Sequence, residues 1–231
     1  KHGDNLIVFP DHVVIHINDT HPALAIPELM RILLDEQGLD WESAWSITTR
    51  TFAYTNHTIL EEALERWPED LFRELLPRLW DIVYEINERF CAQLWDLYPG
   101  DWDKISRLAL IAHGEVKMAH LCIVGSFSVN GVAQLHSNIL REQVFREFAV
   151  FYPEKFTNVT NGVTFRRFLL KSNPGLANLL KERIGSGWIK HPEELEKILP
   201  YQTDQATQSE LAKVRLRNKE TLAQYIFEHN Q

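Results

Sequence analysis

The chain has 231 residues, of which 45% are hydrophobic and 24% are charged, and such proportions are typical of folded globular domains. This length is enough for one large domain or parts of two, and the composition excludes collagen-like, coiled-coil and disordered classes. The 24 basic and 32 acidic residues give a formal net charge of −8. Because no lysine- or arginine-rich block offsets that charge, we expect no nucleic-acid partner.

The cysteines and the apolar segments indicate the cellular compartment and whether a membrane is involved. Cys91 and Cys122 are far apart and belong to no CxxC pair, which excludes a disulfide framework and a cysteine zinc site and favours a reducing, cytoplasmic setting. No stretch of eighteen apolar residues predicts a membrane span, and residues 1–10 lack the apolar segment of a signal peptide. We therefore expect no membrane association and no metal.

The first half of the chain predicts one short strand and a series of helices. The β-branched segment 13–17 favours a strand, and the polar turn after it leads to a helix over most of 23–37. Asp40 is a typical N-cap and predicts a second helix, 41–51. Proline and glycine positions then predict helical segments at 60–67, 71–76 and 78–98.

The second half predicts a boundary between two domains. An apolar segment, 118–124, leads to a glycine-bracketed turn, 125–131, and then to a helical pattern through Leu140. Alternation over 156–163 favours a strand. Further helices are expected over 166–185, with a break at Asn173-Pro174, and near 192–199 and 206–229. The fold class is thus α/β and helix-rich, with a domain junction near 161–167.

Several well-known catalytic patterns are missing from the sequence. There is no GxSxG nucleophile elbow, no P-loop and no GxGxxG. Glu62 and Glu65 could be read as the two carboxylates of a retaining glycosidase, but nothing places them on opposite sides of a bond. His113 and His120 lack a third ligand for a metal, so we assign them no role.

Three polar clusters have the composition of a sugar site. They occupy 18–21, at the carboxyl end of the first predicted strand, 55–58, in a loop between helices, and 160–162. Ligands of α/β sheets bind at strand carboxyl ends, and amides, hydroxyls and imidazoles suit sugar hydroxyls. Turns use the same residue types, so the pattern by itself leaves both interpretations open.

Long segments of the chain match one family in their order and spacing. They are 18–30 (NDTHPALAIPELM), 52–58 (FAYTNHT), 62–67 (EALERW), 84–87 (YEIN), 118–121 (MAHL), 129–132 (VNGV) and 160–162 (TNG). Together they resemble the α-1,4-glucan phosphorylases, the family of the glycogen and maltodextrin enzymes, from Asn18 to the end of the chain.

The resemblance implies an internal fragment of a glycosyltransferase. Inorganic phosphate would cleave the terminal α-1,4 bond of a glucan to give glucose 1-phosphate, assisted by pyridoxal 5'-phosphate, in a parent enzyme that is a homodimer. Residues 1–162 would be the C-terminal part of the N-terminal domain and 163–231 the start of the C-terminal domain, both glycosyltransferase-B-like. The cofactor-bearing lysine would lie beyond residue 231, so we expect the isolated chain to be inactive.

The resemblance also carries roles for individual residues. His57 and Asn161 would be the catalytic contacts to the reacting glucosyl unit. The cofactor would contact Gly131, Val132 and Phe168. Substrate contacts are expected from Asn18, Asp19, His21, Thr51 and Glu65.

One segment departs from the family pattern. Where the family usually reads ITPRRW, residues 163–168 read VTFRRF, so that Phe165 replaces a proline and Phe168 a tryptophan. The indole N–H donor beside the cofactor is thereby lost. A non-catalytic carbohydrate-binding or structural remnant is therefore the alternative function.

Overall fold

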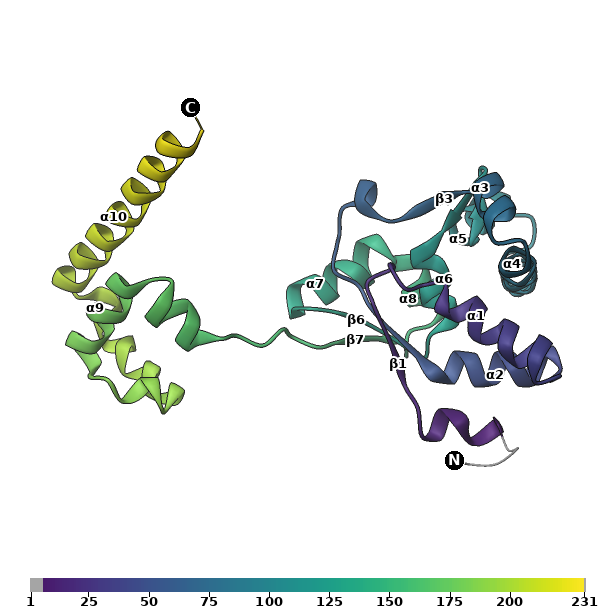
Figure 1. Ribbon diagram of the computed structural model, residues 1–231, viewed down its shortest axis with the longest axis horizontal. Coiled ribbons are helices and arrows are strands. Elements are labelled where there is room, and N and C mark those ends of the chain that lie inside the picture. The colour runs from purple at the N-terminus through teal and green to yellow at the C-terminus, as the bar shows by residue number, and fades with distance from the viewer. Residues whose placement is uncertain (1–5, 231) are drawn as a thin grey trace. The chain divides into compact units, whose positions relative to one another are not determined.

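The computed structural model describes residues 6–230 and divides the chain into two compact units, Lys1–Asn161 and Gly162–Gln231. The division falls one residue from the domain boundary expected from the sequence. Which domain of a larger protein each unit represents stays a prediction. Each unit is described separately below (Figure 1).

A four-stranded parallel sheet forms the centre of the first unit. Its order is β1-β2-β6-β7, and the pairs Ile15↔Phe52, Ala53↔Ser128 and Val129↔Phe156 set the register. Because all four strands are parallel, their carboxyl ends meet at one edge. The strands are β1 (Ile15–Asn18), β2 (Phe52–Thr55), β6 (Ser128–Gly131) and β7 (Phe156–Asn158).

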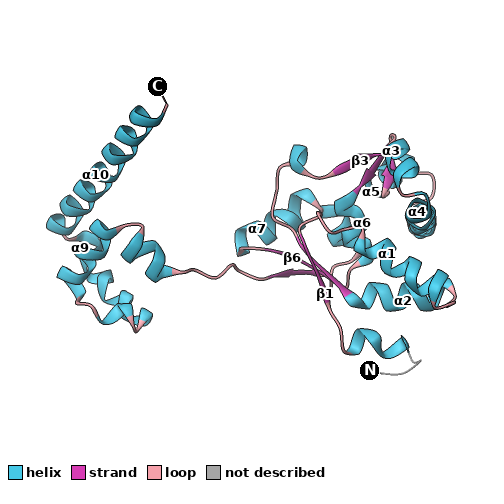
Figure 2. Ribbon diagram, viewed as in Figure 1, coloured by secondary structure: helices cyan, strands magenta, loops and turns pink. Residues whose placement is uncertain are grey.

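Helices pack around this sheet (Figure 2), which buries one face through Ile17, Tyr54 and Val129 and leaves His16 and Thr157 of the other face exposed. The expected helices at 41–51 and 78–98 are confirmed, and the first has the predicted cap, since Asp40 Oδ1 accepts a hydrogen bond from Ser43 N at 2.9 Å. The expected helix over most of 23–37 is present as α1 and a π-helical continuation, Ile32–Glu36. The helices are α1 (Ala25–Arg31), α2 (Trp41–Thr51), α3 (Glu69–Leu75), α4 (Pro77–Leu97), α5 (Trp102–Leu108), α6 (Met118–Gly125), α7 (Gln134–Ile139) and α8 (Arg146–Phe151).

The expected helix at 60–67 is wrong over its second half. Glu61–Ala63 forms a single 3-10 turn, and β3 (Arg66–Pro68) then pairs with β5 (Glu115–Lys117) in a small antiparallel sheet completed by β4 (Ile111–Ala112). Pairing with a segment fifty residues away overrides the local helical pattern. Pro68 is tolerated because β3 is an edge strand.

Helix α6 is the apolar centre of the first unit. All of its residues except His120 are buried, and Gly125 lies so close to α1 that a Cβ there would be 2.8 Å from Ile26 Cγ2. A helix that is apolar on every side has to be covered on every side, which explains why helices and sheet enclose it.

The second unit contains helices and no strand among its described residues. The predicted break at Asn173-Pro174 is confirmed, and Asn173 Oδ1 accepts a hydrogen bond from Leu176 N at 3.3 Å. The segment expected as a helix at 192–199 is a longer 3-10 helix, Pro192–Thr203. The other elements are a π-helical turn (Arg167–Lys171), α9 (Pro174–Ile184), a 3-10 turn (Gly187–Ile189) and α10 (Gln205–His229).

The fold class predicted from the sequence, helix-rich α/β, is thus confirmed for the first unit, whose main sheet proves to be parallel. The second unit was also expected to be α/β, but its described residues form helices only. Within residues 6–230, no helix combines the length and the apolar character that crossing a membrane requires.

Candidate functional site at the carboxyl edge of the parallel sheet

The polar clusters predicted from the sequence come together at one edge of the sheet. We call the segments 18–21, 55–58, 130–132 and 158–161 the polar edge, because each contains or directly follows the carboxyl end of a parallel strand. Main-chain bonds continue past the strand ends: Asp19 N donates to Thr55 O and Asn56 N to Asn130 O, both at 2.9 Å. The arrangement follows from parallel pairing, which brings all four ends to the same side.

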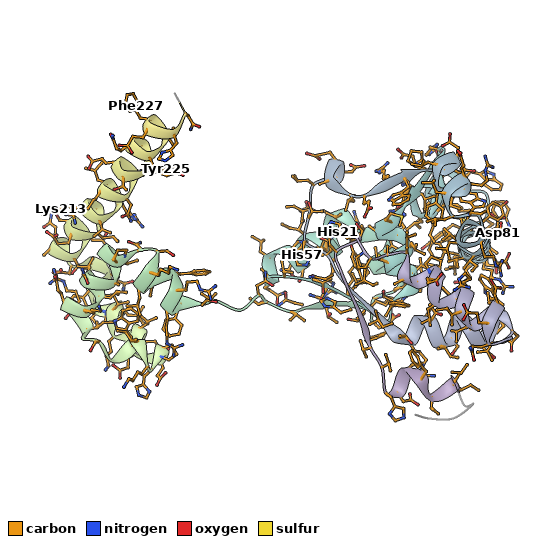
Figure 3. All side chains as sticks on the ribbon, in the orientation of Figure 1. His21, His57, Asp81, Lys213, Tyr225 and Phe227 are labelled. Atoms are coloured by element: carbon orange, nitrogen blue, oxygen red, sulfur yellow. The ribbon has the colours of Figure 1, made fainter. Side chains whose placement is uncertain are left out.

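His57 and Asn18 are in direct contact although 39 residues separate them. The Nε2 atom of His57 lies 2.6 Å from Oδ1 of Asn18, and both residues are exposed. Figure 3 labels His57 and His21, which come from the segments that follow β2 and β1. An exposed imidazole held by an amide is oriented and still open to a ligand.

Asp19 adopts an unusual backbone conformation. Its φ is 66°, in the left-handed region where few residues other than glycine, asparagine and aspartate occur. Its Oδ1 accepts a hydrogen bond from Thr20 N at 2.7 Å. Such conformations concentrate at functional sites, and this one turns the chain directly after β1.

Glu65 is held by two donors beside this turn. Its Oε2 accepts a hydrogen bond from Thr20 Oγ1 at 2.5 Å, and its Oε1 accepts one from Trp67 Nε1 at 2.9 Å. An open groove of about 860 Å³ adjoins it, lined by Asp19, Thr20, His21 and residues 61–66. Glu65 is therefore a fixed acceptor on a hydrophilic groove, of the kind that bonds sugar hydroxyls.

A buried network that the sequence did not predict lies beneath His57. Asn56 is fully buried, its Oδ1 accepts from Thr58 N and lies 3.1 Å from His136 Nε2, and its Nδ2 donates to the hydroxyl of Tyr54. His136 Nδ1 accepts a hydrogen bond from Val132 N at 3.1 Å. Burial raises the pKa of Tyr54 and lowers that of His136, so both are neutral near pH 7.

The two residues expected to contact the cofactor in this unit end β6 and begin the next turn. A Cβ on Gly131 would be 2.6 Å from Oγ and 2.9 Å from N of Ser137, so only glycine lets α7 approach the strand this closely. Val132 is half-buried, and its carbonyl accepts a hydrogen bond from Asn161 N at 2.9 Å. Neither residue has a polar side-chain atom, which suits contact with an aromatic ring, whereas the polar edge contains no lysine or arginine to hold a phosphate.

The other predicted site residues lie in different surroundings. Asn161 is exposed at the end of the first unit, and Phe168 is exposed in the second unit. Thr51 is fully buried at the amino end of β2, where its hydroxyl donates to Ile47 O at 2.7 Å. The structure therefore does not bring Thr51 to the polar edge.

Thiol and metal chemistry receive no support from the described residues. Both cysteines are free, and burial raises the pKa of Cys91 to about 11, which keeps that thiol protonated and unreactive. Between residues 6 and 230, no group of three or more histidine, cysteine, aspartate or glutamate side chains could hold a metal ion.

The fold and site define an α/β protein with a hydrophilic groove at the carboxyl edge of its parallel sheet, and comparison with known proteins gives the family. The profile of the carbohydrate phosphorylase family matches residues 1–231, and the chain belongs to this family. It is 57% identical to the glycogen phosphorylase of Bacillus subtilis (strain 168) over 93% of this chain and 27% of that protein.

Mammalian relatives are similar to nearly the same extent. The chain is 52% identical to the brain form of glycogen phosphorylase from Bos taurus, over 94% of this chain and 26% of that protein. It is also 52% identical to the muscle form from Oryctolagus cuniculus, over 96% of this chain and 27% of that protein. The chain thus spans about a quarter of the length of the curated relatives it matches.

Proposed function

We propose that this chain is part of an α-1,4-glucan phosphorylase, in which the polar edge holds the glucosyl unit that inorganic phosphate removes as glucose 1-phosphate. The observation that carries the proposal is the convergence of 18–21, 55–58 and 158–161 at one sheet edge in a member of the carbohydrate phosphorylase family. Breakdown of glycogen or maltodextrins is the corresponding activity.

His57 and Asn161 are the proposed contacts to the reacting sugar. The imidazole of His57, steadied by Asn18 at 2.6 Å, would bond the O6 hydroxyl, and its main-chain carbonyl would face the anomeric carbon. As that carbon becomes oxocarbenium-like, a fixed carbonyl oxygen stabilises the developing positive charge. Asn161, attached to Val132 through its main-chain N–H, would bond the same sugar.

Asp19, His21 and Glu65 are the proposed contacts to the departing glucan. All three line the groove beside the turn after β1. Glu65 is already aligned by Thr20 and Trp67, so its remaining lone pairs have a fixed direction when sugar hydroxyls approach. Thr51 would act only through the strand that it precedes, because its side chain is buried.

Pyridoxal 5'-phosphate is the proposed cofactor, and its phosphate group would exchange a proton with the substrate phosphate. Gly131 and Val132 would pack against its ring, with Phe168 of the second unit as a further contact. The polar edge has no lysine or arginine, and the family resemblance implies that residues outside this chain would hold both phosphates. The chain's own contribution is to position the sugar and exclude water.

The proposal places the two units in two glycosyltransferase-B-like domains. The first unit would be the C-terminal part of the N-terminal domain, and the second the start of the C-terminal domain. The whole enzyme would be a cytoplasmic homodimer. The alternative, a non-catalytic carbohydrate-binding remnant, rests on Phe165 and Phe168 in the segment 163–168.

A chimera tests the proposal. The matching quarter of the Bacillus subtilis glycogen phosphorylase is replaced by this chain, and glucose 1-phosphate release from maltooligosaccharide and inorganic phosphate is measured. We expect activity together with a cofactor absorbance band that persists through dialysis. A folded, cofactor-loaded chimera without activity would contradict the proposal and favour the remnant, for which glucan binding by calorimetry is the direct test.

A further inference from the structure

Asn56 connects two loops that carry different parts of the polar edge. It directly precedes His57 and is fully buried, and every polar atom of its side chain has a partner: Thr58 N and His136 on Oδ1, and Tyr54 on Nδ2. This buried amide has one orientation, because a flipped amide would turn Nδ2 toward Thr58 N, which can only donate. The loop 55–58 is therefore fixed from beneath.

His136 completes the connection and has a defined tautomer. Val132 N can only donate, so the Nδ1 atom of His136 that it contacts at 3.1 Å must be unprotonated. Oδ1 of Asn56 accepts from Thr58 N at 2.9 Å and therefore faces His136 as an acceptor. The ring proton consequently resides on Nε2, and the imidazole is neutral.

We propose that Asn56 and His136, here called the Asn56–His136 bridge, are positioning residues that set the distance between His57 and the Gly131–Val132 turn. One end of the bridge adjoins His57 in sequence, and the other bonds the amide of Val132, whose carbonyl also accepts from Asn161. The catalytic part of this inference rests on the proposed function, because it assigns His57 and Asn161 to the sugar and Val132 to the cofactor.

The surroundings of His136 favour the neutral ring that the bridge requires. A proton on Nδ1 would face the N–H of Val132, so the imidazolium form cannot keep both bonds. Burial lowers the pKa of His136, and His57 lowers it further, while the main chain of Thr58 opposes both effects. The bridge is therefore intact at neutral pH.

The tautomer and the two bonds can be observed in this chain without catalysis. Nitrogen-15 NMR should show His136 Nδ1 at the shift of an unprotonated ring nitrogen and Nε2 at that of a protonated one. In His136→Gln, whose amide can reach Asn56, exchange of the Val132 amide hydrogen should accelerate about tenfold while Thr58 keeps its rate. In His136→Asn, whose oxygen can reach Val132 N, the pattern should reverse.

The chimera described above tests whether the bridge positions His57. His136→Gln, His136→Asn and Asn56→Asp should each lower kcat about tenfold and change KM for maltooligosaccharide less. As a control, His191→Gln, at an exposed histidine of the second unit, should change neither.

A protonated Nδ1 of His136, or the same exchange pattern of the Val132 and Thr58 amides in both His136 variants, would overturn the bridge. Unchanged kcat in both would overturn its positioning role. An inactive unaltered chimera would instead refute the proposed function, while the NMR pattern still decides the bridge.

Discussion

The two units are both rich in helix but differ sharply in what they bury. The first has one continuous core around the parallel sheet, in which Ile17, Phe52 and Val129 are completely inaccessible. The core of the second consists of Ala177, Leu180 and Trp188 with partly buried neighbours. On α10, Tyr225 and Phe227 are 58% and 66% exposed (Figure 3).

The difference shows what a sheet contributes to a small unit. Parallel strands with one face buried bring segments that are distant in sequence into one core, whereas helices that pack in pairs bury only narrow stripes. Since burial of apolar surface is the main favourable term in folding, we expect the first unit to be the more stable and the polar edge to be the more rigid part of the chain.

Replacing one phenylalanine in each unit should give the largest difference in unfolding free energy between the units. Phe90 is 2% exposed and contacts the rings of Phe148, Phe151 and Tyr152. Phe90→Ala should lower the free energy of unfolding of the first unit by about 3–5 kcal/mol, and Phe227→Ala should change that of the second by no more than about 0.5 kcal/mol. Urea unfolding followed by hydrogen exchange separates the two units, and equal losses would refute the contrast.

A half-buried histidine gives the first unit a specific acid sensitivity. His120 Nδ1 donates to the carbonyls of Leu108 and Ala109, and burial lowers its pKa to about 4. Because the unfolded chain binds this proton near pH 6.5, stability is complete above that pH and falls by about 3 kcal/mol as the pH drops to 4. Titrating the unfolding free energy of the wild type and of His120→Asn should show this loss only in the wild type. An equal loss in the variant would remove His120 as its cause.

Two glycines test how tightly the polar edge is packed. Gly131→Ala should destabilise the first unit by about 1–3 kcal/mol, because the added Cβ would meet the side chain and main chain of Ser137. Gly162→Ala, just beyond the unit boundary, meets no atom within 4 Å and serves as the matched control. Thermal melts of both variants are sufficient, and equal melting temperatures would contradict the close approach of α7.

Two lysines provide the smallest expected effect. Lys155 donates to the carbonyls of Ile123 and Val124 at the end of α6, and Lys155→Met would leave both without this partner, at about 1–2 kcal/mol. Lys213 pairs with Glu210 on exposed α10, so Lys213→Met should cost about 0.5 kcal/mol or less. If chemical denaturation gives the same loss of unfolding free energy for Lys155→Met and Lys213→Met, the contrast in burial between the two units does not translate into stability.

The sequence predicted most of the helices because their signals are local. Asp40 caps α2, and Pro77 and the 99–101 turn bracket α4. It did not predict β2, β3 or β6 as strands, because each is stabilised mainly by pairing with segments far away in sequence. The sequence predicts an ordinary helix near 192–199, and the structure has a longer 3-10 helix there, Pro192–Thr203.

The candidate site was predicted to a similar degree. The residue types and the predicted strand before 18–21 singled out both 18–21 and 55–58, but 55–58 was expected in a loop between helices, whereas it follows strand β2 and meets Asn18 through His57. His136 could not be found, because its partner Asn56 is 80 residues away and a single histidine in a helical pattern carries no signal. Thr51 was expected at the site only because of the family resemblance, and its side chain is buried.

The central claim is that the polar edge holds the reacting sugar, and the most direct measurement is kcat of the His57→Ala chimera. The claim predicts that glucose 1-phosphate formation slows about 100-fold while KM for maltooligosaccharide changes little, since the contact strengthens in the transition state. Thr51→Val, away from that edge, should leave kcat near the unaltered value. A His57→Ala chimera with unchanged kcat, or with an effect confined to KM, would contradict the claim.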